Sequence, residues 1–415
     1  MNISTRLVGR WAAMIVVLVG SAAAFADDWT RFRGPHGAGI AIAAALPVEW
    51  TAEDQAWETL LPGVGHSSAV VHGDRVFVTS ANEDGTSRQL HCLNAGTGEI
   101  LWTRSLPLRT DKLHAKNSFA SGTPALSDDL AVVAFADDER FVVAAYHHDG
   151  TPAWNKDLGP FDSPHGHGAS PIIWRDLVIV PNDQDGDSSL VALDLASGDV
   201  AWKSSRPSGD TSYSTPFVLE VDGKAPQLIA SCNAMGVTSL DPSTGTLNWQ
   251  SGKLPQRTVC SPVFADGVIV QSCGQGGRGT LLVGIDPFAT SDDDRLVFEE
   301  KKLLPYVPTP IAFDGHLYLW NDNGVVVCVD CKTHKPVWTE RIGGNFSASP
   351  VCVNGNLYAV SEDGEVIVVR ASPEFELLGR SSLGDRSQAT PAVADGKMFF
   401  RTFHKVICLA PAGAK

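Results

Sequence analysis

Short apolar segments separated by turn residues recur from about residue 68 to the end of the chain. Each repeat opens with a small residue and an apolar strand, followed by a turn, a second apolar strand, a polar turn and a third strand. A turn of the type Asp-x-x-Thr-Gly then leads into a short strand that ends in Trp. Apolar and polar residues alternate within segments such as 75–79 and 316–320, which is typical of β-strands. The pattern predicts an all-β chain built from four-stranded antiparallel units.

Seven of the repeats start at a Ser-Pro or Thr-Pro pair, and these pairs recur every 40 to 48 residues. They are Thr123-Pro124, Ser170-Pro171, Thr215-Pro216, Ser261-Pro262, Thr309-Pro310, Ser349-Pro350 and Thr390-Pro391, with 67–69 as a degenerate first copy. Four strands at this spacing are typical of propeller blades. Eight starts predict an eight-bladed β-propeller. Seven blades is the alternative, because repeats five and seven have Phe298 and Leu378 near the expected position of the final Trp.

The last repeat lacks its fourth strand, and the N-terminal part of the chain supplies a candidate. Residues 54–62 match residues 98–107, with Trp57 in the position of Trp102. We therefore expect an N-terminal strand to complete the last blade and close the ring, which removes exposed sheet edges. The repeat-ending tryptophans should pack between neighbouring blades. They are Trp102, Trp154, Trp202, Trp249 and Trp338.

Residues 1–26 have the pattern of a cleaved signal peptide. Arg6 and Arg10 precede an apolar segment, and Ala24-Phe25-Ala26 fits a cleavage site. The sequence thus predicts one propeller domain over residues 27–415, in the periplasm or secreted. No transmembrane span is expected after cleavage, and no Cys follows the apolar segment to carry a lipid. The net charge of −15 argues against nucleic-acid binding, and we expect a monomer.

The Trp-ended repeat with Asp-x-x-Thr-Gly turns resembles the propeller repeat of pyrroloquinoline-quinone (PQQ) proteins, and the segment 29–39 resembles the start of many exported members. That PQQ-like family includes quinoprotein alcohol dehydrogenases and BamB-like exported scaffolds. The resemblance implies the fold, while the function stays open between these classes. The dehydrogenases share an adjacent Cys-Cys pair over the quinone, and no two Cys are adjacent here. No c-type haem motif is present, since Lys332 follows Cys331.

Loops that join one blade's last strand to the next blade's first strand should meet at one mouth of the channel. These loops are rich in polar and ring side chains, and we predict a ligand-binding site there. The predicted site residues are His66, Lys116, Asn117, His165, His167, Tyr213, Arg257, Tyr306, Asn345 and Arg386, with His114 close by. No metal site is predicted; the candidates, if His ligands converged, are His66, His165 and His167.

Two further motifs are interpreted as structural. Residues 183–187 place three Asp in one turn, which we expect to be a solvated turn rather than a calcium loop. The eight Cys are scattered, and Cys92, Cys328 and Cys408 fall on the same repeat position, which favours buried packing residues. Cys328 and Cys331 could pair only with strain.

The leading hypothesis is an exported, non-catalytic scaffold that binds an envelope protein or a small ligand at the channel mouth. No cofactor is predicted for it, and its catalytic residues, if any, are unknown. The alternative is a PQQ-dependent or related oxidoreductase, for which the resemblance implies PQQ with calcium. A third hypothesis is a hydrolase or lyase that uses the His-rich loops. Convergence of Lys116, Arg257 and Arg386 would favour an anionic ligand.

Overall fold

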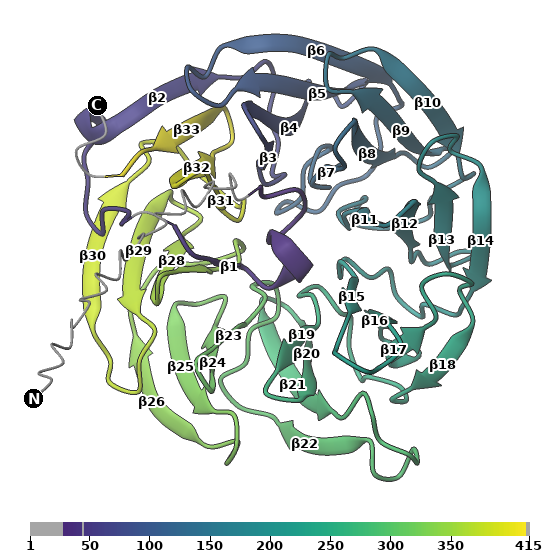
Figure 1. Ribbon diagram of the computed structural model, residues 1–415, viewed down its shortest axis with the longest axis vertical. Helices are drawn as coiled ribbons and strands as arrows, with labels where there is room; N and C mark the ends of the chain where they lie inside the picture. Colours follow the sequence, from purple (N-terminus) through teal and green to yellow (C-terminus); the bar gives the residue numbers. More distant parts are fainter. Residues whose placement is uncertain (1–27, 44, 412–415) are drawn as a thin grey trace, which may run out of the picture.

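The computed structural model describes residues 28–43 and 45–411. Eight sheets stand in a ring around a central axis (Figure 1). The prediction of an eight-bladed propeller is confirmed, and the alternative of seven blades is wrong. The predicted signal peptide lies outside the described residues. Within the part of the chain that is described, no helix has the length and apolar character needed to cross a membrane.

The first four blades follow one another along the chain, each with its strands in order from the axis to the rim. Blade 1 holds β3 (Val70–His72), β4 (Arg75–Ala81), β5 (Ser87–Asn94) and β6 (Ile100–Pro107). Blade 2 holds β7 (Ala125–Leu126), β8 (Leu130–Ala136), β9 (Phe141–His147) and β10 (Pro152–Asp157). Blade 3 holds β11 (Ile172–Trp174), β12 (Leu177–Asn182), β13 (Ser189–Asp194) and β14 (Val200–Ser205). Blade 4 holds β15 (Phe217–Leu219), β16 (Gln227–Cys232), β17 (Gly236–Leu240) and β18 (Leu247–Gln250).

The remaining blades repeat this order, and the last one takes a strand from the N-terminal region. Blade 5 holds β19 (Val263–Ala265), β20 (Val268–Gln275), β21 (Arg278–Ile285) and β22 (Leu296–Glu300). Blade 6 holds β23 (Ile311–Phe313), β24 (His316–Trp320), β25 (Val325–Asp330) and β26 (Pro336–Arg341). Blade 7 holds β27 (Val351–Val353), β28 (Asn356–Val360), β29 (Glu365–Arg370) and β30 (Leu377–Ser382). Blade 8 holds β31 (Ala392–Ala394), β32 (Lys397–Arg401), β33 (Lys405–Leu409) and β2 (Gln55–Leu60).

Closure of the ring by an N-terminal strand is confirmed. β2 pairs antiparallel with β33, with Trp57 opposite Cys408. Before it, the short 3-10 helix η1 (Pro35–Gly37) lies in the centre of the ring and β1 (Ile40–Ala41) pairs in parallel with β27 (Figure 1). The 3-10 helix η2 (Ala52–Asp54) leads into β2. The N-terminal region therefore both fills the axis and completes the rim.

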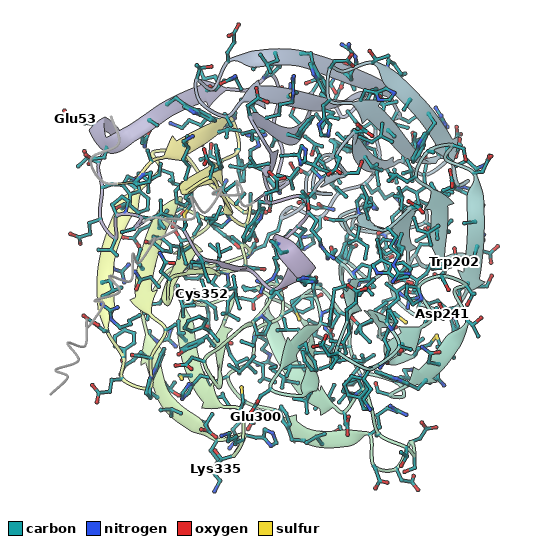
Figure 2. All side chains as sticks on the ribbon, viewed as in Figure 1. Glu53, Trp202, Asp241, Glu300, Lys335 and Cys352 are labelled. Carbon is teal, nitrogen blue, oxygen red and sulfur yellow. The ribbon has the colours of Figure 1, made fainter. Side chains whose placement is uncertain are left out.

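The tryptophans that end the outer strands join neighbouring blades, as the repeat predicts. The Trp202 indole donates a hydrogen bond to the carbonyl of Pro242 in the next blade at 3.0 Å, and Figure 2 shows Trp202 beside Asp241 of that turn. A Cβ on Gly245 would lie 2.5 Å from the Trp202 ring. The glycine of the turn, at φ 70°, thus serves both the left-handed backbone and the close approach of the indole.

Where a repeat lacks Trp, another side chain takes its place. Phe298 stacks on His334 of blade 6 with ring centroids 4.1 Å apart. His334 itself replaces the usual turn glycine, at φ 56°. Leu378 packs partly buried against the core shared by blades 7, 8 and 1. The irregular repeats therefore still form complete blades.

The turn at residues 183–187 is not a purely solvated turn, so that prediction was wrong in part. Asp183 is buried and forms an ion pair with Arg206, whose Nε donates to Asp183 Oδ1 at 2.8 Å. Asp185 and Asp187 are exposed, as predicted. The sequence pattern could not reveal that a buried arginine from β14's end lies against this turn.

All eight cysteines are free, and seven of them are buried. The prediction of buried packing residues is confirmed for Cys92, Cys328 and Cys408, which lie on third strands of their blades. Cys331 is half-buried, and burial raises the pKa of its thiol to about 11. The thiolate is the reactive form of cysteine, so even this residue should react slowly.

Iodoacetamide at neutral pH should therefore modify at most one of the eight cysteines in the native protein. In denaturant without reductant, all eight should be modified. Intact-mass spectrometry before and after denaturation measures both numbers. If only six cysteines were modified in denaturant, two of the eight would be joined in a disulfide. That result would contradict the free state of Cys328 and Cys331.

Candidate functional site

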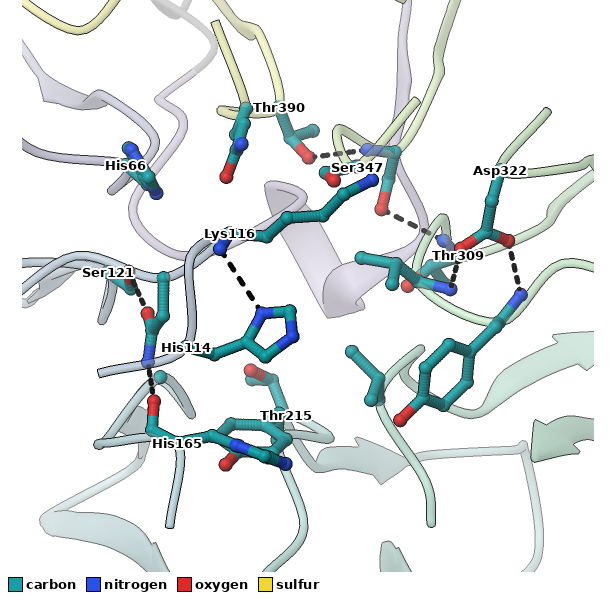
Figure 3. Close-up of a pocket in the computed structure, with 18 of the residues that line it drawn as sticks. His66, His114, Lys116, Ser121, His165, Thr215, Thr309, Asp322, Ser347 and Thr390 are labelled. Atoms are coloured by element: carbon teal, nitrogen blue, oxygen red, sulfur yellow. Dashed lines mark hydrogen bonds between the residues drawn. The ribbon is translucent and has the colours of Figure 1, made fainter. Parts of the chain in front are cut away.

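A cavity of about 650 Å³ lies on the axis, at the end of the ring where the blade-connecting loops meet (Figure 3). Because each blade is preceded by such a loop, polar side chains from all around the ring converge on it. The loops before all eight inner strands contribute residues to its lining, together with Phe32, the turn at 275–277 and Asp322. Its size is that of a pocket for a small organic molecule.

The axis is closed on one side by residues 28–39, which we call the plug. Its backbone pairs with β3 between Trp29 and Val71 at 2.9 Å in both directions. Further along, Thr30 accepts from the amide of Leu126, and Gly39 accepts from that of Cys352, each at 2.7 Å. The plug is thus bonded to blades 1, 2 and 7. Phe32 lines the cavity and forms part of its floor.

Arg33 anchors the plug. Its fully buried guanidinium donates to the carbonyls of Gly37 and Ala38 at 3.1 and 3.0 Å, within the plug itself. It also donates to Pro310 at 2.8 Å, and to Thr309 and Pro350 at 3.2 Å, on blades 6 and 7. Burial lowers the pKa of Arg33 to about 9, so the group remains charged at neutral pH. One side chain thus satisfies five carbonyls.

A ring of Ser and Thr hydroxyls, which we call the belt, encircles the cavity. Each belt residue starts a repeat, and the backbone amide of every belt residue before the last, Thr390, donates to the hydroxyl of the next. Seven such bonds of 3.0–3.2 Å connect eight residues in order. The belt residues are Ser68, Thr123, Ser170, Thr215, Ser261, Thr309, Ser349 and Thr390. Most belt residues are followed by a proline, which restricts the backbone of the residue before it. The backbone is therefore restricted at the residues that form this series of hydrogen bonds.

Seven of the ten predicted site residues line the cavity. They are His66, Lys116, Asn117, His165, Tyr213, Arg257 and Tyr306. Three others lie elsewhere. His167 packs against Phe141 and Phe161 with ring centroids 4.8 and 5.4 Å apart. Arg386 lies over Phe403 at 4.9 Å, and Asn345 is exposed.

The three weak metal candidates are not gathered. His66 packs on Phe403 at 4.6 Å, whereas His165 lies against His114 at 5.1 Å. Burial and nearby arginines lower the pKa of His66 to about 4, and burial lowers that of His167 to the same value. In residues 28–43 and 45–411, no group of three or more His, Cys, Asp or Glu side chains could hold a metal.

The charged groups of the cavity differ in their pairing. Lys116 reaches across the mouth to Glu362 of blade 7 at 2.7 Å, as its direction toward Ser347 in Figure 3 illustrates. Arg257 donates from Nε to the carbonyl of Thr211 at 2.9 Å and has no carboxylate partner within the described residues. Burial, together with Arg257 and His114, lowers the pKa of His165. Arg257 is therefore the least compensated charge of the lining.

Sequence reasoning missed several parts of the site. Asp322 is buried, and its carboxylate accepts from the amides of Tyr306 at 2.7 Å and Val307 at 3.3 Å. Burial raises the pKa of Asp322. Phe32 and Gln388 also line the cavity. The recurring Ser-Pro and Thr-Pro pairs belong to the belt and could have indicated it. In the sequence, however, they were equally well explained as the starts of the repeats.

Fold and site together define a PQQ-like, eight-bladed β-propeller whose axial cavity is floored by its own N-terminal segment. Comparison with family models identifies it further. The chain belongs to the family described as "Outer membrane protein assembly factor BamB", whose model matches residues 48–222, 111–293 and 300–415.

Relatives of two kinds resemble the chain. The outer membrane protein assembly factor BamB of Yersinia pestis is 28% identical over 280 residues, which cover 65% of this chain and 63% of that protein. The polyvinylalcohol dehydrogenase of a Pseudomonas species is 27% identical over 228 residues, 52% of this chain and 33% of the enzyme. The chain thus matches less than two thirds of each relative's length.

Solved structures show the same fold at lower identity. BamB from Moraxella catarrhalis has a TM-score of 0.63 at 16% identity, covering 87% of this chain and 98% of that one. The quinohemoprotein alcohol dehydrogenase of Comamonas testosteroni has a TM-score of 0.67 at 11% identity, covering 93% and 81%. A BamB and a quinohemoprotein alcohol dehydrogenase therefore share this architecture, so the fold alone does not decide the function.

The cavity does not fit the calcium that the dehydrogenase alternative implies. Ca²⁺ takes six to eight oxygen ligands, often from several carboxylates. Among the residues that line the cavity, Asp322 is the one carboxylate. Both of its oxygens already accept backbone amides. The lining is instead rich in hydroxyl and cationic donors, which suit an anion better than a metal ion.

Proposed function

We propose that this protein is an exported, non-catalytic scaffold of the cell envelope that binds a small ligand in the cavity on its axis. The observation that carries the proposal is a cavity of about 650 Å³ into which seven predicted residues converge and which the plug floors. An open channel would let a molecule pass, whereas a floored cavity retains it. Concave sites with a few converging polar groups are typical of ligand pockets.

Membership of the BamB family supports the non-catalytic part of the proposal and the place in the envelope. The donor set supports it too, since Asp322 is the only carboxylate lining the cavity. A protein partner is the second candidate, because relatives of this family are named as outer membrane assembly factors. The oxidoreductase alternative rests on the dehydrogenase relatives.

A Gln388→Trp variant tests the cavity. Gln388 lines it and makes no side-chain hydrogen bond to another described residue, so an indole at this position should fill the space with little loss of stability. We expect a panel of sugars, organic acids and PQQ, with and without calcium, to contain a compound that raises the melting temperature of the unmodified protein. Gln388→Trp should abolish that rise, because binding stabilises the folded state only where the site is open.

Gln250→Trp is the matched control, since Gln250 is exposed on the outer strand β18; it should keep the full thermal shift. Equal shifts in both variants would place binding outside the cavity. If no compound shifts the unmodified protein and pull-downs recover the same envelope protein with either variant, the protein-partner candidate replaces the proposal. Dye reduction by alcohols after loading with PQQ would favour the oxidoreductase.

A further inference from the structure

We propose that the ligand is a small organic acid, held with its carboxylate on the axis among the belt hydroxyls and the guanidinium of Arg257. This inference rests on the proposed function and names the chemical class that the same cavity would take. Three sets of groups carry it: the belt, the two arginines of the plug, and Arg257. The belt hydroxyls donate to no other described residue, and none of the three arginines has a carboxylate partner among the described residues.

The belt presents hydroxyl protons for which the described part of the chain offers no acceptor. Seven belt hydroxyls each accept one backbone amide. None of the seven donates a hydrogen bond to another described residue, although each belongs to a residue at most 6% exposed. Six of these residues line the cavity: Thr123, Ser170, Thr215, Thr309, Ser349 and Thr390. Buried hydroxyl donors ordinarily find an acceptor, and an anion on the axis would supply one to several of them.

Two guanidinium groups lie against the belt from the plug side. Arg31 donates from Nη2 to the carbonyl of Pro216 at 2.7 Å, and Arg33 donates to Thr309 and Pro310. Pro216 directly follows belt residue Thr215. Neither arginine has a carboxylate within ion-pairing distance in the described residues. Burial lowers the pKa of Arg31 to about 10 and that of Arg33 to about 9. Both therefore add an uncompensated positive charge next to the cavity floor.

Arg257 provides a cation within the cavity itself. Its Nε donates to the carbonyl of Thr211, and its guanidinium also interacts with the side chain of Tyr306, which leaves part of its donor set for a ligand. The guanidinium lies 6.0 Å from the ring centre of Tyr213, and it offsets part of the burial-driven rise in the pKa of Tyr306. A guanidinium can bind a carboxylate through two parallel hydrogen bonds.

The carboxylates near the cavity are already engaged. Asp322 accepts two backbone amides. Asp185 accepts the amide and the hydroxyl of Thr211, each at 2.7 Å. Glu362 is bonded to Lys116 and to the hydroxyl of Ser347, both at 2.7 Å. The cavity therefore keeps a surplus of donors and cations in a protein whose net charge is −15.

The other lining residues indicate what the non-carboxylate part of the acid should be like. Phe32, Tyr213 and Tyr306 contribute rings, and Val259 and Val307 contribute apolar surface. A cavity of about 650 Å³ exceeds what acetate or inorganic phosphate would fill. A ring-bearing carboxylate would use both the apolar walls and the donors.

Calorimetric titration of the full protein with 2-naphthoate tests the proposal, with 2-naphthamide as the neutral analogue of the same shape. We expect saturable binding of the acid, and binding of the amide weaker by about tenfold or more. Inorganic phosphate is the comparison for a simple anion. Equal binding of acid and amide, or binding of phosphate without naphthoate, would overturn the proposal.

Arg257→Gln should weaken naphthoate binding by about 10- to 100-fold, because a hydrogen-bonded ion pair is lost. Arg341→Gln on exposed β26 should have no effect. For the belt, Thr215→Val should weaken binding, and Thr215→Ser, which keeps the hydroxyl, should restore it. Unchanged affinity in Arg257→Gln would overturn the proposal even if Thr215→Val failed to fold. If neutral compounds bind in a manner sensitive to Gln388→Trp but acids do not, the anion proposal fails while the ligand-binding scaffold stands.

Discussion

A Trp57→Ala variant should lose about 3–5 kcal/mol of unfolding free energy, the usual cost of removing a large packed aromatic side chain. Trp57 lies on β2, the strand that closes the ring. Its indole donates to the carbonyl of Ala95 in blade 1 at 3.1 Å and packs on Phe399 of blade 8 with ring centres 6.0 Å apart. Urea unfolding followed by tryptophan fluorescence or circular dichroism measures the loss.

Trp154→Ala is the matched comparison. Trp154 is also half-buried on an outer strand and donates to the carbonyl of Leu195 in the next blade at 2.8 Å. Its seam, however, lies between blades 2 and 3, which are also joined by continuous chain. β2 is likewise joined to blade 1 by residues 61–69, but its link to blade 8 is the pairing with β33, whereas β10 follows directly after β9 of its own blade. We therefore expect Trp57→Ala to be the more destabilising variant, and a milder effect would argue against the importance of closure.

An Arg33→Met variant should cost about 3 kcal/mol, because five carbonyls lose their donor and cannot all regain one from water. Part of this cost is offset because a buried charge without a carboxylate partner is removed. The floor next to Phe32 should loosen as well. Chemical denaturation gives the stability, and the melting-temperature shift with a cavity ligand reports the floor.

Arg341→Met, at an exposed site, should change stability by less than about 0.5 kcal/mol. Arg33→Lys keeps the charge but has fewer and differently arranged donors, so its cost should fall in between. A loss below about 1 kcal/mol in Arg33→Met would mean that solvent reaches the five carbonyls, and the plug would then not be the tight floor described above.

Features that recur from one repeat to the next could be predicted from the sequence. Turn glycines, outer tryptophans and Ser/Thr-Pro starts recur in most blades, so blade number, strand order and closure by β2 could be predicted. The loops at the mouth could be predicted as well, because propeller topology brings them together. This is why seven of ten predicted site residues line one cavity.

Features that depend on a single long-range contact could not be predicted. His167 looked like a second ligand beside His165, but it follows a glycine and packs between Phe141 and Phe161. Asp183 was predicted to be solvated because nothing in the sequence indicates that Arg206 forms an ion pair with it. The plug was visible only as a resemblance over residues 29–39, and nothing local indicates that Arg33 bonds to carbonyls from blades 6 and 7.

Pairing of β2 with β33 also constrains the order in which the molecule can fold. The ion pair between Glu58 and Lys405 joins residues 347 positions apart at 2.7 Å. The first strand of the rim must wait for the last strand to be synthesised, and contacts of such high sequence separation form slowly. Until then blades 1 and 8 expose seams that could associate with other chains. Refolding should therefore be slow and concentration-sensitive, and a circular permutant that joins β33 directly to β2 should fold faster than the natural chain.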